Sequence, residues 1–114
     1  MNLTTLPVID WELGIKLAGN KKELAEEILA LFIKNLSPDY SAIHEFYVAE
    51  NYTELLQRLH RLRGALCYCG LPRLKWITAQ LETELKSNSQ THLSALMSQL
   101  EGEVQLLLKQ YDEP

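Results

Sequence analysis

The chain has 114 residues, of which 46% are hydrophobic and 23% are charged, values that predict one folded domain over residues 1–114 and exclude a disordered chain. The formal net charge is −4, which argues against a nucleic-acid partner, because a general nucleic-acid binder presents a broad basic surface. No run approaches the ~18 apolar residues of a membrane span, and the N-terminus lacks a signal pattern, so a soluble domain without membrane contact is predicted.

The first half of the chain predicts helices of different lengths. A short leading helix is expected over about residues 10–18, with Gly19 placed to supply a left-handed turn at its end. A longer helix follows, and its broad apolar side contains Leu24, Ile28, Leu31 and Phe32. Ser37 followed by Pro38 predicts a further helix start, since serine caps helices and proline suits the first helical position.

The second half of the chain carries three apolar stripes at helical spacing, separated by short polar connectors. The stripes are formed by Tyr52, Leu55, Leu59, Leu62 and Leu66, then by Leu74, Ile77, Leu81 and Leu85, and last by Leu93, Leu96, Met97, Leu100, Val104, Leu107, Leu108 and Tyr111. Strand patterns are absent, and short connectors favour antiparallel neighbours. The predicted fold is therefore all-α, an antiparallel up-down four-helix bundle over about residues 21–112 with an additional short N-terminal helix.

The two cysteines, Cys67 and Cys69, are separated by one residue. Within a helix their side chains would point about 200° apart, which does not suit a disulfide. Free thiols in a reducing cytoplasm are therefore expected.

One histidine lies away from the apolar side of its predicted helix. At about 100° per residue, His60 is roughly 130° from the centre of the leucine stripe and should point into solvent. The residues expected to share its face include Leu56, Gln57, Gly64 and Cys67. We interpret the other histidines, at positions 44 and 92, as ordinary surface residues.

Gly64 lies one helical turn after His60 and costs the helix roughly 0.5–1 kcal/mol relative to alanine. Two explanations are open: another helix packs closely against Gly64, or the missing side chain gives a bulky partner access to the imidazole. Between positions 55 and 81 there are five Lys and Arg residues and no Asp or Glu. This basic surround favours a partner with an acidic cleft or a phosphoryl group.

The residue types around His60 limit its chemistry. A hydrolytic histidine needs an orienting carboxylate, and none is near it in sequence, which leaves a spatial neighbour such as Glu82 open. A metal site is not predicted, because zinc needs three or four ligands and Cys67 would lie roughly 10 Å along the helix. Reversible phosphorylation of the imidazole needs only an accessible nitrogen and a nearby cation, and Arg63 is placed to supply the charge.

The run His60-Arg61-Leu62-Arg63-Gly64, with Gly70 six residues further on, resembles the motif of the histidine phosphotransfer (HPt) family. The segments "VIDW" (8–11) and "YCGLPRLK" (68–75) are most similar to the C-terminal HPt domains of BarA-type tripartite hybrid sensor kinases. The usual lysine of the motif is replaced here by Arg63, which keeps the charge but changes the hydrogen-bond geometry.

The resemblance implies that Nε2 of His60 takes a phosphoryl group from a receiver-domain aspartate and passes it to the aspartate of a response regulator. It implies that this chain holds no cofactor, that Mg²⁺ is bound by the receiver partner, and that the chain has no autonomous kinase activity. It also implies a monomeric cytoplasmic domain, which in a hybrid kinase would be the C-terminal part of an inner-membrane sensor kinase. His60, Arg63 and Gly64 are the expected phosphotransfer residues. The expected docking residues are Leu56, Gln57, Arg61, Cys67, Gly70 and Arg73. The alternative is a non-catalytic helical interaction module.

Overall fold

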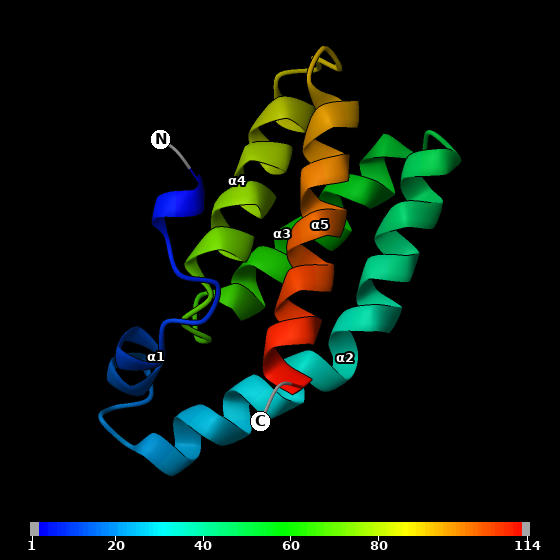
Figure 1. Ribbon diagram of the computed structural model, residues 1–114. Coiled ribbons are helices and arrows are strands. Elements are labelled where there is room, and N and C mark those ends of the chain that lie inside the picture. Colours follow the sequence, from blue (N-terminus) through cyan, green and yellow to red (C-terminus); the bar gives the residue numbers. More distant parts are fainter. Residues whose placement is uncertain (1–2, 113–114) are drawn as a thin grey trace.

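The computed structural model describes residues 3–112 and is built from helices throughout this range (Figure 1). The elements in chain order are the short 3₁₀ helix η1 (Leu3–Thr5) and the α-helices α1 (Trp11–Leu17), α2 (Lys22–Val48), α3 (Tyr52–Leu66), α4 (Pro72–Lys86) and α5 (Leu93–Asp112). Helices α2 to α5 run alternately up and down, while α1 lies beside the lower end of the bundle (Figure 1). The predicted four-helix bundle with a short leading helix is confirmed.

The core is made by the predicted apolar stripes. In α3 the four leucines Leu55, Leu59, Leu62 and Leu66 are each at most 5% exposed. The stripes of α4 and α5 supply further buried side chains, among them Ile77, Leu81, Leu100 and Leu107. Burying one such side chain stabilises the fold by roughly 1.5–3 kcal/mol, so the leucine stripe fixes which face of α3 remains exposed.

The predicted helix start at Ser37 is wrong, because α2 continues without interruption from Lys22 to Val48 and contains Pro38 in its interior. Proline has no N–H and crowds the preceding turn, so it bends a helix more often than it ends one when packing continues on both sides. The buried residues Phe32, Leu36 and Ile43 provide that packing. Helix α2 changes direction in this part of the chain, between its cyan and teal sections (Figure 1).

Helix α1 is attached to the turn between α3 and α4 by backbone contacts. The side chain of Asp10 caps α1 by accepting a hydrogen bond from the Leu13 N–H at 3.0 Å, and the Asp10 N–H donates to the Gly70 carbonyl at 2.9 Å. Gly70 has a φ of +64°, and a Cβ there would lie 2.6 Å from the backbone carbonyl oxygen of Asp10 and 2.7 Å from the backbone nitrogen of Gly14. Only glycine fits this close approach.

Candidate functional site

His60 lies in the second half of α3 and points away from the core. Asn51 begins this helix, since its side-chain oxygen accepts a hydrogen bond from the Glu54 N–H at 3.3 Å, as expected for an N-cap. Because the leucine stripe is buried against the other helices, the opposite face carries His60, whose side chain is 64% exposed. The predicted solvent exposure of this imidazole is confirmed.

A carboxylate of the next helix contacts the imidazole. Oε2 of Glu82, in α4, lies 3.1 Å from Nδ1 of His60, and Oε1 accepts a hydrogen bond of 2.6 Å from Nε of Arg63. Nζ of Lys86 is 3.5 Å from Oε2, one helical turn further along α4. The Glu82 side chain is only 3% exposed, so one buried carboxylate connects three basic side chains from two helices.

The charge state of Glu82 follows from these contacts. Burial raises the pKa of the Glu82 carboxyl, but the hydrogen bonds from Arg63 and His60 and the charges of these two residues outweigh burial and lower the pKa below its ordinary value. Glu82 is therefore ionised at neutral pH.

An ionised carboxylate can only accept hydrogen bonds, so the neutral imidazole of His60 must donate from Nδ1. The proton is thereby held on Nδ1 and the lone pair remains on Nε2. In the neutral imidazole, this contact leaves Nε2 as the unprotonated ring nitrogen of an exposed side chain.

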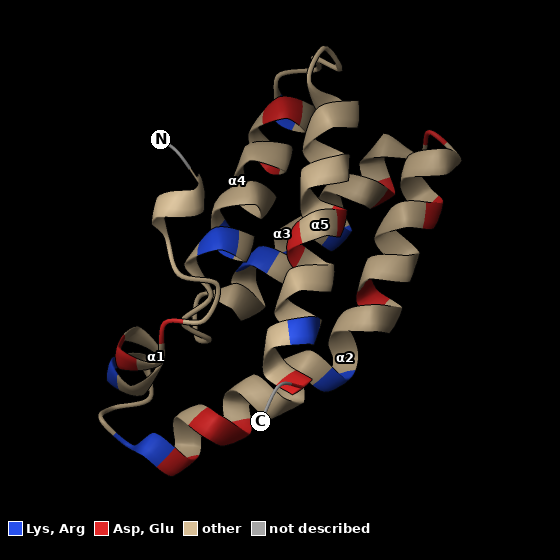
Figure 2. Cartoon of the chain, viewed as in Figure 1, with Lys and Arg blue, Asp and Glu red and all other residues tan. Residues whose placement is uncertain are grey.

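The surface around Gly64 is open. A Cβ built on Gly64 would meet nothing within 4 Å, so the close packing of another helix, one of the two explanations for this glycine, is excluded. Gly64 is exposed one turn after His60, together with Gln57, Arg61 and Cys67, and Leu56 is half-buried beside them. Basic positions lie on α3 and on the lower half of the neighbouring α4 (Figure 2).

Two of the predicted docking residues lie elsewhere. Gly70 is buried against α1 for the steric reason given above. The Arg73 side chain is 15% exposed, and its terminal nitrogen pairs with Oε1 of Glu103 in α5 at 2.7 Å. Both residues hold helices together in this structure, and the Arg73 charge is already paired with Glu103.

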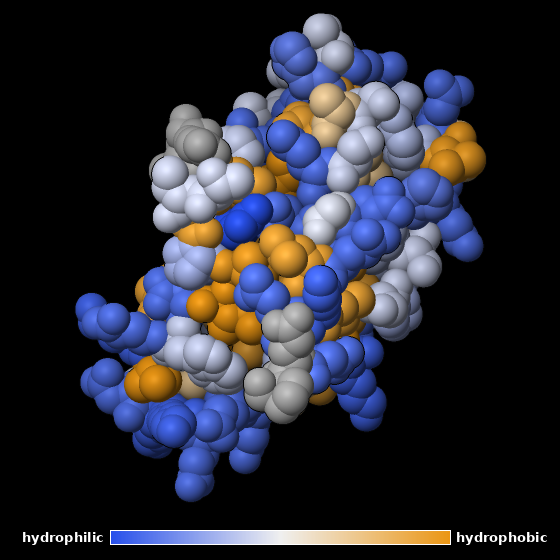
Figure 3. Space-filling view, viewed as in Figure 1, coloured by the Kyte–Doolittle hydropathy of each residue, from blue (hydrophilic) through white to orange (hydrophobic). Residues whose placement is uncertain are grey.

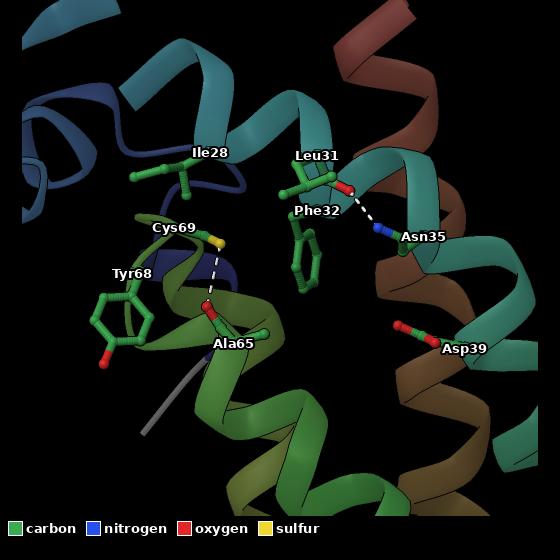
Figure 4. Close-up of a pocket in the computed structure, with 8 residues that line it drawn as sticks. All are labelled: Ile28, Leu31, Phe32, Asn35, Asp39, Ala65, Tyr68 and Cys69. Carbon is green, nitrogen blue, oxygen red and sulfur yellow. Dashed lines mark hydrogen bonds between the residues drawn. The ribbon is translucent and has the colours of Figure 1, made fainter. Parts of the chain in front are cut away.

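Other hollows and apolar surfaces lie apart from His60. A cavity of about 450 Å³ lies between α2 and the end of α3 and is lined by Ile28, Leu31, Phe32, Asn35, Asp39, Ala65, Tyr68 and Cys69 (Figure 4). Cys69 donates a hydrogen bond to the Ala65 carbonyl. Burial, and to a lesser extent the charge of Cys67, raises the pKa of the Cys69 thiol to about 11. Both cysteines are free, as predicted. On the face in Figure 3, apolar residues gather between α1 and the lower part of α5.

Residues 3–112 contain no group of three or more His, Cys, Asp or Glu side chains that could hold a metal ion. The helices of the same range include none that is long and apolar enough to cross a membrane. The features that remain are one exposed imidazole, its buried carboxylate and an open surface on a four-helix bundle. These are the features of a phosphoryl carrier.

Comparison with known proteins identifies the family. The profile of the Hpt domain family matches residues 27–110, and the chain belongs to this family of histidine phosphotransfer domains of phosphorelays. The sensor histidine kinase GacS of Pseudomonas protegens is 37% identical over 91 residues, which are 80% of this chain and 10% of that protein. The kinase BarA of Escherichia coli K12 is 31% identical over 81 residues, 71% of this chain and 9% of that protein.

The fold is also that of a solved relative. The HPT domain of the Hpt sensor hybrid histidine kinase from Shewanella is 26% identical and superimposes with a TM-score of 0.68, covering 98% of this chain and 100% of that one. The chain spans about a tenth of the length of the two kinases.

The sequence singled out His60, Arg63 and Gly64 and left Glu82 open as a spatial neighbour of the histidine, and the structure brings Glu82 into contact with His60 and Arg63. A sequence signal for Glu82 does exist. Glu82 follows Leu81 and precedes Leu85 by three residues, so it is a charged residue within the buried side of α4, where an unpaired charge would be costly.

Proposed function

We propose that His60 is the phosphorylated residue of this domain and that Nε2 is the nitrogen that carries the phosphoryl group. The observation that supports this most directly is the 3.1 Å contact between Nδ1 of His60 and the buried Glu82, which leaves Nε2 of a 64% exposed side chain as the nucleophile. Neither His44 nor His92 has an ion pair with a carboxylate among the described residues.

The transfer reaction is a displacement at phosphorus. The Nε2 lone pair forms the N–P bond while the P–O bond of the partner's aspartyl phosphate breaks, and its electron pair leaves on the aspartate carboxylate. The second transfer reverses these changes with another aspartate. This chain supplies no metal in either step, and Mg²⁺ belongs to the receiver partner.

Arg63 and Gly64 assist His60 in different ways. The Arg63 guanidinium has five N–H donors, of which the Nε–H is used on Glu82, and it places positive charge one turn from the imidazole. Gly64 leaves room for the partner to approach. Leu56, Gln57, Arg61 and Cys67 surround the histidine as the docking surface.

The donor in this proposal is the receiver domain of a hybrid sensor kinase, and the acceptor is a response regulator. The domain works as a cytoplasmic monomer and has no kinase activity of its own. Because a carrier must release both partners, we expect its interfaces to be small and its complexes to be transient. The rate at which the domain associates with a partner should fall as salt screens the basic residues.

The proposal is tested by incubating the chain with a phosphorylated receiver domain and Mg²⁺ and following acid-labile, base-stable phosphate on the chain. The wild type and the matched variants His44→Gln and His92→Gln should each gain phosphate, while His60→Gln should gain none. Phosphate on the His60→Gln variant would overturn the assignment. If neither the wild type nor any variant took phosphate from the receiver domain, the alternative function, a non-catalytic helical interaction module, would replace the proposed one.

A further inference from the structure

A groove between α2 and α3 is apolar at one end and charged at the other. We propose that it binds a free α-amino acid with an apolar side chain, whose ammonium group contacts Asp39 and whose carboxylate contacts the arginines of α3. The groove does not face His60, because Ala65, which lines it, follows His60 by five residues and so lies about 140° further around the helix. The inference is therefore independent of the proposed phosphotransfer.

The residues of α2 that line the groove lie on one side of that helix. Ile28, Leu31, Phe32, Asn35 and Asp39 recur at three- and four-residue steps, and the Phe32 ring and the Asp39 carboxylate both point into the cavity between the two helices (Figure 4). This stripe is apolar from Ile28 to Phe32 and ends in a negative charge at Asp39. A ligand lying along α2 therefore meets hydrocarbon at one end and a carboxylate at the other.

The apolar end has room for a large side chain. The cavity of about 450 Å³ lies within the range of roughly 300–1,000 Å³ that is typical of small-molecule sites. Two of its lining residues, Leu31 and Tyr68, are 62% and 63% exposed, although both carry large apolar groups. An aromatic or branched side chain that entered the cavity would remove this apolar surface from water, which favours binding.

Charges of both signs gather at the other end. A hollow of about 150 Å³ shares Asp39 and Ala65 with the cavity and is also lined by Arg58 and Arg61. Within residues 3–112, none of these three charged side chains has an ion pair, and the Arg58 guanidinium lies 5.9 Å from the centre of the Phe46 ring. Free positive and negative groups in adjoining hollows suit a zwitterion, because each ligand charge then finds a partner of opposite sign.

The balance of charges separates this ligand from simpler ones. An apolar amine would pair with Asp39 but face two arginines, and an apolar acid would pair with an arginine but meet the free carboxylate of Asp39. Only a ligand that carries both groups avoids both repulsions. Because Asp39 and Arg58 are half-buried and Arg61 is exposed, water weakens these contacts, and we expect a Kd on the order of 1 mM.

The first test titrates the chain with L-phenylalanine up to about 20 mM and follows its backbone amides in ¹H–¹⁵N spectra. Saturable shifts are expected along α2 and at the end of α3. Two matched probes, 3-phenylpropionate and 2-phenylethylamine, lack the ammonium and the carboxylate respectively, and each should bind about three- to fivefold more weakly. Equal affinities for all three probes would overturn the proposal, and so would the absence of saturable shifts with L-phenylalanine.

The second test removes one charge from the groove. Asp39→Asn, with helicity retained, should bind L-phenylalanine about three- to fivefold more weakly and should no longer prefer it to 3-phenylpropionate. Glu45→Gln is the matched control, since Glu45 is an exposed carboxylate further along α2, and it should bind as the wild type does. An intact preference in Asp39→Asn, or an equal loss in Glu45→Gln, would refute the site. His60→Gln should bind L-phenylalanine normally, so failure of binding and failure of phosphotransfer are separate results.

Discussion

Replacing Gly64 by alanine should make the domain more stable and its phosphotransfer slower. Gly64 lies inside α3, and the new Cβ would meet nothing within 4 Å. Alanine is favoured over glycine in a helix interior by roughly 0.5–1 kcal/mol. For a chain of this size the gain corresponds to a rise in Tm of roughly 2–6 °C, measurable by circular dichroism.

The same methyl group would stand on the proposed docking surface for a receiver domain, one turn from His60. A methyl group added to a tightly packed contact costs about 1–3 kcal/mol, so we expect the rate of transfer to fall roughly 5- to 150-fold. The rate is measured in single turnovers with phosphorylated receiver, below saturation, so that weaker docking and slower chemistry both register.

Gly102→Ala provides the matched control for this prediction. Gly102 is an exposed glycine inside α5, and a Cβ there also meets nothing within 4 Å. It should show the same gain in Tm with no change in transfer. If Gly64→Ala transferred phosphate within twofold of Gly102→Ala, the argument that Gly64 provides access for the partner would be refuted.

Three further predictions concern stability and are read from urea unfolding. Gly70→Ala should lower the free energy of unfolding by about 2–4 kcal/mol, because the Cβ would strike backbone atoms of Asp10 and Gly14 at a positive φ, and a loss below about 1 kcal/mol would contradict the contact. Folding lowers the pKa of the Glu82 carboxyl, so ionised Glu82 stabilises the folded state at pH values above the ordinary carboxyl pKa, and this stabilisation is lost as the pH falls through the folded pKa. The difference in the free energy of unfolding between the wild type and Glu82→Gln should therefore shrink between about pH 5 and pH 3. A difference that stays constant over this range would argue against an ionised Glu82. Leu59→Ala should cost about 3–4 kcal/mol, since Leu59 is 0% exposed, and a small cost would mean that the core repacks.

The helices and the exposed histidine could be predicted because they depend on local spacing. The four leucines of α3 recur every three or four residues, and that periodicity alone fixes the direction of His60 relative to the core. Local signals failed at Pro38, where a serine and a proline resemble a helix start. There the apolar residues on both sides of the proline pack on the same core, and tertiary packing keeps α2 continuous.

The Glu82 contact could not be derived from spacing, because it joins positions 22 residues apart on two helices. It depends on the register between α3 and α4, which in turn depends on the turn around Gly70 and its contact with α1. The same reason explains Arg73, whose sequence position suggested a docking cation but whose side chain reaches Glu103 on α5. A charged residue within an apolar stripe is the pattern that identifies both carboxylates.

His60, Arg63 and Glu82 all project from regular turns of α3 and α4, and their mutual hydrogen bonds already exist without a partner. In the proposed function, a nucleophile assembled in advance spends little free energy on rearrangement when the phosphoryl donor arrives. The time course of signalling through such a domain is then governed by how often partners collide with it and how long they stay, both of which are set by surface residues that can change without disturbing the chemistry.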